Sequence, residues 1–172
     1  KVCCEYLTTD YNRKGFIDGR SIRLPTISVR AGKPNLAASS FASGIIREPL
    51  SGVISLCPVS PETCVWILSP GKVVEAFIHA HNLPSSAWGL NRVLNLPGIT
   101  TSVNEMVSSL RKLAGNKVAD LVEWKPDARI QSIVMTWPAR YTTERALKLG
   151  FVGDTDIESI IREYIEEQDI KL

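Results

Sequence analysis

The residues best suited to chemistry in this chain lie in one short polar loop. Arg30 ends a predicted apolar strand at 20–30, and Lys33 and Asn35 follow it in a stretch that also contains glycine and proline. Open α/β sheets bind ligands beyond the carboxyl ends of their strands, and the planar guanidinium group of arginine matches a carboxylate or a phosphate. The loop therefore predicts a site for an anionic small molecule, with an ordinary solvated loop as the alternative.

Hydroxyl groups follow this loop, whereas metal ligands do not gather anywhere in the sequence. Ser39 and Ser40 lie on the next predicted helix and could contact a polyol, or could simply allow close helix packing. His79 and His81 are two positions apart, so on a helix they face different ways and cannot form the i, i+4 pair of a zinc helix. We predict no metal site.

The cysteines also argue against a metal site. Cys3, Cys4, Cys57 and Cys64 form no Cys-x-x-Cys pair. Free thiols in a reducing cytosol are expected, which predicts a cytoplasmic protein. A disulfide between Cys57 and Cys64 across a predicted turn is geometrically conceivable, but no apolar signal segment favours an oxidising compartment.

Hydrophobic periodicity predicts helices that alternate with strands. The predicted helices are 2–15, 36–50, 71–83, 102–115, 128–137, a short one within 140–151, and 154–170; the predicted strands are 20–30, 53–59, 64–70, 92–96 and 118–124. Such alternation is typical of an α/β fold with a mostly parallel sheet.

Helix starts and faces follow from the same patterns. Thr100 or Thr101 is the expected cap of the helix near 102, and Asp154 or Thr155 that of the last helix. The helix 71–83 is expected to place its apolar residues on one broad face, namely Val73, Val74, Phe77, Ile78 and Ala80.

Length and composition allow one modest domain. The chain has 172 residues, of which 44% are hydrophobic and 22% charged, and this composition is ordinary for a globular protein. The formal charge of +2 is too small to favour nucleic acid or a membrane surface as a partner, and no apolar run is long enough to span a bilayer.

The opening of the chain points to a longer protein. Lys1 begins a predicted helix without an initiator methionine or a capping residue, and a cation is disfavoured at that end by the helix dipole. We expect this sequence to be the C-terminal part of a larger chain.

Three short strings carry a resemblance to a known family: Arg23–Ile27 (RLPTI), Gly32–Asn35 (GKPN) and Arg47–Leu50 (REPL). Together with the opening lysine and the Gly150-Phe151 segment before the last helix, the sequence resembles the extended short-chain dehydrogenase/reductases, also called the NAD-dependent epimerase/dehydratase family. The resemblance covers essentially the whole chain.

The resemblance implies the fold and the domain organisation. Residues 1–31 would be the tail of an NAD-binding Rossmann domain, with the catalytic helix and the strand after it. Residues 32–172 would mainly form a small α/β substrate-binding lobe, and 61–97 would return to the Rossmann sheet.

The resemblance also implies roles for particular residues. Lys1 would be the lysine of the family's Tyr-x-x-x-Lys pair, the tyrosine falling before the chain, so Lys1 would be catalytic and would bind NAD. Pro25, Thr26 and Ile27 would face the nicotinamide. Substrate binding would fall to Thr26, Arg30, Lys33, Asn35, Ser39 and Arg140. Simple alternatives remain: an exposed terminal lysine for Lys1, strand termination for Pro25, and packing or a surface ion pair for Arg140.

The implied activity is NAD-dependent oxidation of a secondary hydroxyl group in a small sugar acid such as D-erythronate, with NADP left open as the cofactor. Two other functions compete with it: epimerisation or dehydration of a nucleotide sugar, and a non-catalytic ligand-binding or dimerisation module. Thr26 stands where the sugar epimerases carry asparagine, which weakens the case for a nucleotide sugar.

The opening helix is also predicted to be an interface. Dehydrogenases that this sequence resembles commonly form homodimers through the catalytic helix, and here an apolar stripe at helical spacing consists of Val2, Cys3, Tyr6, Leu7 and Tyr11.

Overall fold

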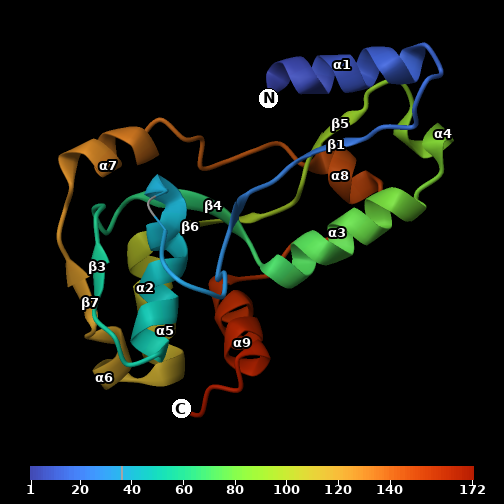
Figure 1. Ribbon diagram of the computed structural model, residues 1–172. Coiled ribbons are helices and arrows are strands. Elements are labelled where there is room, and N and C mark those ends of the chain that lie inside the picture. Colours follow the sequence, from blue (N-terminus) through green and yellow to red (C-terminus); the bar gives the residue numbers. More distant parts are fainter. Residues whose placement is uncertain (36) are drawn as a thin grey trace.

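The computed structural model describes residues 1–35 and 37–172 (Figure 1). Its helices are α1 (Val2–Arg13), the 3₁₀ helix η1 (Ala38–Ser40), α2 (Phe41–Leu50), α3 (Pro70–Asn82), α4 (Ser85–Trp88), α5 (Val103–Ala114), α6 (Asn116–Ala119), α7 (Ala128–Val134), α8 (Glu144–Lys148) and α9 (Ile157–Glu167). Its strands are β1 (Ser21–Arg23), β2 (Thr26–Ile27), β3 (Ser55–Cys57), β4 (Cys64–Leu68), β5 (Val93–Asn95), β6 (Ile99–Ser102) and β7 (Val122–Trp124).

The strands form three small sheets in the described part of the chain. β1 runs parallel to β5, and β3 runs parallel to β7. In the third sheet β4 is the central strand, parallel to β2 and antiparallel to β6. The predicted α/β class with mostly parallel pairing is confirmed.

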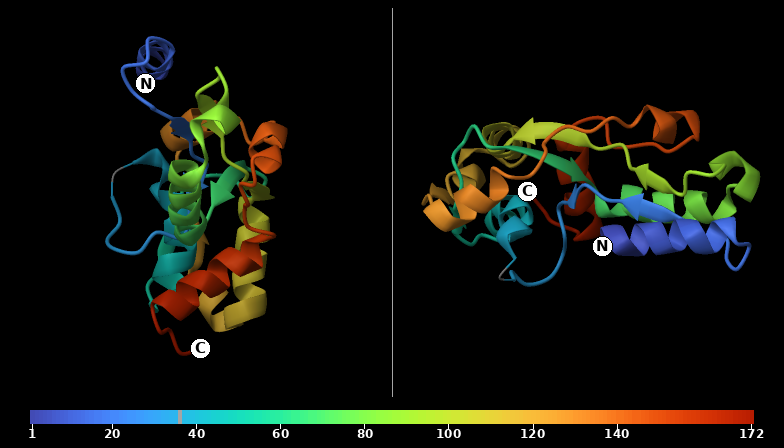
Figure 2. Two further views of the ribbon diagram at one scale, coloured as in Figure 1. Left: turned by 90° about the vertical axis from the view of Figure 1, so that its right-hand side faces the viewer. Right: turned by 90° about the horizontal axis from the view of Figure 1, so that it is seen from above.

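Two hydrophobic cores divide the molecule into two lobes. The larger core joins α2, α5 and α9. The smaller core lies where α3 packs near β5 and α8, and Figures 1 and 2 show these elements, with α1, on the opposite side of the molecule from α2 and α5. Strand β4 serves both cores, because Ile67 belongs to the larger one and its neighbour Leu68 to the smaller one. The β2–β4 pair therefore lies at the boundary between the lobes.

The predicted strand 20–30 is interrupted. β1 and β2 are separated by Leu24 and Pro25, and they pair with different partners, β5 and β4. Proline has no N–H group to donate to a ladder, so the chain changes sheets at this point.

Two predicted helix caps were wrong. Thr100 and Thr101 lie in β6, opposite Trp66 and Val65 of β4. The cap of α5 is Ser102, whose Oγ accepts from Glu105 N at 3.1 Å while Ser102 N donates to Glu105 Oε2 at 2.7 Å. This reciprocal pair is a capping box.

The last helix begins later than predicted, at Ile157 with Asp156 as its cap. Asp156 Oδ1 accepts from Ser159 N at 2.7 Å. The expected cap Asp154 is engaged elsewhere, since its Oδ2 accepts from Ser69 N at 2.7 Å. The first residue of the predicted helix 36–50 lies outside the described residues, and the described part of that segment consists of η1 followed by α2.

Two helices leave apolar residues uncovered. The predicted face of α3 is only partly correct, because Val73, Ala76 and Ala80 are buried while Val74, Phe77 and Ile78 are exposed. No residue of α1 is buried. In the described part of the chain no helix is long and apolar enough to cross a membrane, and all four cysteines are free, Cys57 being buried.

Candidate active site

A cavity beside β2 collects several of the predicted site residues. It has a volume of about 360 Å³ and is lined by Leu24, Pro25, Thr26, Ile27, Arg30, Ser39 and Trp137. Because β2 lies between the two cores, this cavity opens at the boundary between the lobes. The structure thus brings together the predicted nicotinamide-facing segment and two predicted substrate-binding side chains.

Helix α2 fixes the backbone that carries Arg30. Ser28 Oγ donates to Ala42 O at 2.7 Å, and Arg30 N donates to Ser43 Oγ at 3.1 Å. Arg47 Nη1 donates to Arg30 O at 2.8 Å. With its backbone N–H and C=O both held, Arg30 presents its side chain to the cavity from a defined position.

Arg47 is itself held by an ion pair. Its Nε and Nη2 donate to Glu48 Oε1 at 3.2 and 2.6 Å, and the side chains of Arg47 and Glu48 are only 9% and 15% exposed. A buried charge is tolerated when it is paired and hydrogen-bonded. The Arg47–Leu50 string thus has a structural task, because its first residue fixes Arg30.

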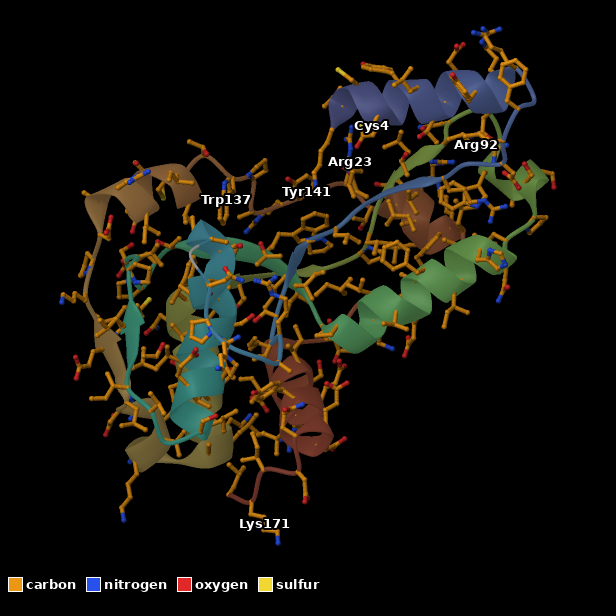
Figure 3. All side chains as sticks on the ribbon, viewed as in Figure 1. Cys4, Arg23, Arg92, Trp137, Tyr141 and Lys171 are labelled. Atoms are coloured by element: carbon orange, nitrogen blue, oxygen red, sulfur yellow. The ribbon has the colours of Figure 1, made fainter. Side chains whose placement is uncertain are left out.

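Aromatic side chains close the other side of the cavity. Figure 3 shows Trp137 and Tyr141 near each other on the segment after α7. The Tyr141 ring stacks on Trp66 of β4 with centroids 3.9 Å apart, and Trp66, Trp137 and Tyr141 line a second cavity of about 170 Å³ that shares Leu24 and Thr26 with the first. Trp137 was not among the site residues predicted from the sequence.

Other predicted residues lie apart from this cavity. Lys33 is exposed, and Asn35 and Ser40 line a different cavity of about 580 Å³ between η1, β3 and the start of α7. Asn35 Oδ1 accepts from Ala37 N at 2.9 Å. Arg140 is exposed next to Tyr141. The predicted cluster of Arg30, Lys33 and Asn35 is therefore divided between two places.

Lys1 lies at the exposed start of α1. Figures 1 and 2 show α1 along one edge of the molecule, with its other end leading into the loop before β1. The helix is fastened to β1 by Arg23, whose Nε and Nη2 donate to Glu5 Oε1 and Oε2 at 2.9 and 2.6 Å. The hydrogen bond from Arg23 lowers the pKa of Glu5.

Gly98 lies against Pro25, which lines the cavity, and sequence reasoning also missed this glycine. A Cβ atom at this position would lie 2.8 Å from Pro25 Cγ and 2.7 Å from both Trp66 Nε1 and Ile67 O. Only a residue without a side chain allows β4 and Pro25 to approach this closely. A glycine after a proline in the sequence indicates a turn, but nothing in the sequence points to this contact.

The residues present suit only one end of a dinucleotide. Pro25, Thr26 and Ile27 line one wall of the cavity, and a flat ring could pack against them. The sequence contains no Gly-x-Gly-x-x-Gly loop, which is the element that holds a pyrophosphate in Rossmann folds. Within the described residues no group of three or more His, Cys, Asp or Glu side chains lies close enough together to hold a metal ion.

Comparison with known proteins gives a consistent result. The chain is 54% identical over 167 residues to D-erythronate dehydrogenase of Cupriavidus necator, and 46% identical over 166 residues to D-erythronate dehydrogenase of Haemophilus influenzae. These alignments cover 97% and 96% of this chain but 52% and 53% of the relatives. The chain thus spans about half the length of these relatives. No protein-family profile matches the chain.

Solved structures share the fold over a similar extent. A nucleoside-diphosphate-sugar epimerase from Agrobacterium tumefaciens matches 99% of this chain and 50% of its own, with a TM-score of 0.95 and 40% identity. An L-threonine dehydrogenase from Phytophthora infestans matches all of this chain and 55% of its own, with a TM-score of 0.85 and 26% identity. The resemblance noted in the sequence is confirmed, as is the fold class of the C-terminal part of an extended short-chain dehydrogenase/reductase.

Proposed function

We propose, from the homology of this chain to D-erythronate dehydrogenases, that it forms the substrate-binding part of an NAD-dependent dehydrogenase that oxidises a secondary hydroxyl group of a small sugar acid such as D-erythronate. One observation carries the proposal: a cavity at the boundary of the lobes joins a fixed arginine, Arg30, to hydroxyl groups from Thr26 and Ser39. A cation beside hydroxyl groups suits a molecule that bears both a carboxylate and alcohols.

The chain would bind and orient the substrate in this reaction. The guanidinium group of Arg30 would hold the carboxylate, and the hydroxyls of Thr26 and Ser39 would contact the polyol. Pro25 and Ile27 would form the surface against which the nicotinamide packs. When bound, NAD supplies the hydride acceptor. NADP is an alternative, because the residues that distinguish the two cofactors do not occur in this sequence.

Lys1 would help to move the proton. In the family that the chain resembles, a tyrosine four positions earlier takes the hydroxyl proton, and residues i and i+4 share one face of a helix. The ammonium group of Lys1 beside that tyrosine would lower its pKa and favour the phenolate. Residues 1–31 would then complete an NAD-binding domain, 32–172 would mainly form the substrate lobe, and 61–97 would return to the sheet of the NAD-binding domain.

The proposal is tested in the full-length protein, meaning the longer protein that would contain this chain. Purified full-length protein should reduce NAD when supplied with D-erythronate, as measured by NADH absorbance. The 172-residue chain alone should form no NADH, because the catalytic tyrosine and the glycine-rich loop that the resemblance implies would lie outside it. NADH formation by the chain alone would contradict the proposal that Lys1 acts together with a tyrosine four positions earlier.

A second candidate function is epimerisation of a nucleotide sugar. The cavity of about 580 Å³ that Asn35 and Ser40 line offers additional space beside η1 and β3, and the matched Agrobacterium tumefaciens structure bears an epimerase name. Calorimetry separates the candidates: a nucleotide sugar that binds the full-length protein, with no NADH formed from sugar acids, would favour the epimerase.

A further inference from the structure

Trp137 lies where several cavities meet. It lines the cavity of about 360 Å³ with Arg30, the cavity of about 170 Å³ with Trp66, and a third of about 340 Å³ with Cys64 and Met135. Trp137 therefore borders the space beside Arg30 and two further spaces, both of which Cys64 of β4 also lines.

The segment that carries Trp137 is fastened on both sides. Trp137 N donates to Val134 O at 2.9 Å at the end of α7. The Thr100 hydroxyl of β6 donates to the carbonyl of Ala139, and the Tyr141 ring stacks on Trp66. Trp137 itself packs against the larger core. With these supports on both sides, the indole is a fixed wall in this structure.

The Trp137 indole lines the same cavity as the side chains proposed to bind the substrate. Thr26 and Trp137 line both the cavity of about 360 Å³ and that of about 170 Å³, whereas Arg30 and Ser39 line only the first of these. A substrate whose carboxylate is held by Arg30 and whose hydroxyls meet Thr26 would lie beside Trp137, which lines the same cavity. Additional carbons would have to enter the space that the indole closes.

We propose that Trp137 determines substrate specificity by limiting the length of the hydroxy-acid chain. This inference rests on the proposed function and adds to it the substrate class: open-chain polyhydroxy acids of about four carbons, with acids of five or six carbons rejected by the indole. Trp137 takes no part in proton or hydride transfer.

The test compares the full-length protein with Trp137→Ala, Trp137→Leu and Trp137→Phe, using NAD and aldonic acids of four, five and six carbons. One methylene-sized group in a pocket changes discrimination by roughly 10- to 200-fold. Trp137→Ala should therefore raise the ratio of kcat/KM for the six-carbon acid to that for the four-carbon acid by about 10- to 100-fold. Trp137→Leu should give a smaller rise, and Trp137→Phe the smallest.

Met135→Ala is the matched control. Met135 lines the third cavity but not the cavity of Arg30, and its side chain is 67% exposed. This change enlarges the space behind the indole without opening the wall, so the ratio should stay at the wild-type value. If Trp137→Ala does not fold, Trp137→Leu carries the test.

The outcomes distinguish a failure of the inference about Trp137 from a failure of the proposed function. Activity on four-carbon acids with an unchanged ratio in the folded Trp137 variants would overturn the role of Trp137 alone. A full-length protein that oxidises none of the acids would overturn the proposed function, and the inference with it. A rise in the ratio that Met135→Ala reproduces would also overturn the inference, because the wall would then not be the cause.

Discussion

Helices α1 and α2 carry similar sequence signals but have different surroundings. Both show apolar residues at helical spacing, yet nine of the ten residues of α2 are buried, whereas none of α1 is. Tyr6 and Leu7 of α1 are 73% and 58% exposed. Periodicity shows which face of a helix is apolar, but not which other element covers that face.

The two helices also differ in their ion pairs. Arg47 and Glu48 of α2 are 9% and 15% exposed, while Arg13 of α1 and its partner Asp10 are 66% and 40% exposed. Desolvation makes the loss of one partner costly only in the first case. This contrast leads to the largest effect that we predict.

Arg47→Ala in the full-length protein should lower the free energy of unfolding by about 3 to 5 kcal/mol. It leaves the Glu48 carboxylate buried without its partner and removes the donor to Arg30 O. Urea denaturation measures the effect. Arg13→Ala is the matched control, with no measurable change expected. Equal effects of the two changes would contradict the distinction between the helices.

Arg30→Ala tests whether the side chain of Arg30 binds the substrate or stabilises the fold. The side chain of Arg30 lines the cavity while its backbone groups make the contacts to α2, so its truncation should leave stability close to that of wild type. Loss of a charged hydrogen bond of roughly 1.5 to 3 kcal/mol should raise KM for the sugar acid by about 10- to 100-fold. Steady-state kinetics of the full-length protein measure this change. Unchanged KM would return Arg30 to the role of a solvated loop residue.

The sequence predicted the components of the site better than their arrangement. Arg30, Thr26 and Ser39 line one cavity, because a strand followed by a polar loop and a helix brings them to one place, and their roles in substrate binding stay a prediction. Asn35 lines a different cavity from Arg30 and Lys33 is exposed, and the hydrogen bonds of Asn35 with Ser40 and Ala37 are not readable from the sequence pattern.

Trp137 and Gly98 could not be found from local patterns. Each acts through contacts with residues far away in the sequence: Trp137 with the β2 cavity, and Gly98 with Pro25 and Trp66. Such contacts depend on how the two lobes are joined. Hydrophobic spacing carries no information about that arrangement.

The next prediction concerns the exposed apolar stripe on α1, which includes Tyr6 and Leu7. We propose that in the full-length protein part of this stripe forms a homodimer interface, so Tyr6→Glu or Leu7→Glu would bury an unpaired carboxylate. Each should weaken the dimer by at least about tenfold, or 1.4 kcal/mol. Light scattering over a concentration series measures this effect. Wild-type protein that stays monomeric at micromolar concentration would contradict the proposal.

The smallest effect concerns the boundary between the lobes, where Asp154 fastens the start of α3. Asp154 Oδ2 accepts from Ser69 N at 2.7 Å. Burial raises the pKa of this carboxyl group more than the hydrogen bonds from Ser69 lower it, with Glu163 acting in the same direction as burial and Lys72 opposing it. A raised folded-state pKa means that the folded protein binds the proton more tightly than the unfolded chain. The contribution of Asp154 to stability is therefore full in acid and is lost as the pH rises through its folded pKa.

Asp154→Asn should remove this pH dependence. The amide oxygen can still accept from Ser69 N, but the side chain carries no charge that must be desolvated. The melting temperature of the variant minus that of wild type should therefore be larger at pH 7 than at pH 4. Thermal unfolding of the full-length proteins at both pH values measures this difference. Comparing the two proteins at each pH cancels the carboxyl groups that they share. A difference in melting temperature that is the same at both pH values, or larger in acid, would show that burial does not dominate at Asp154.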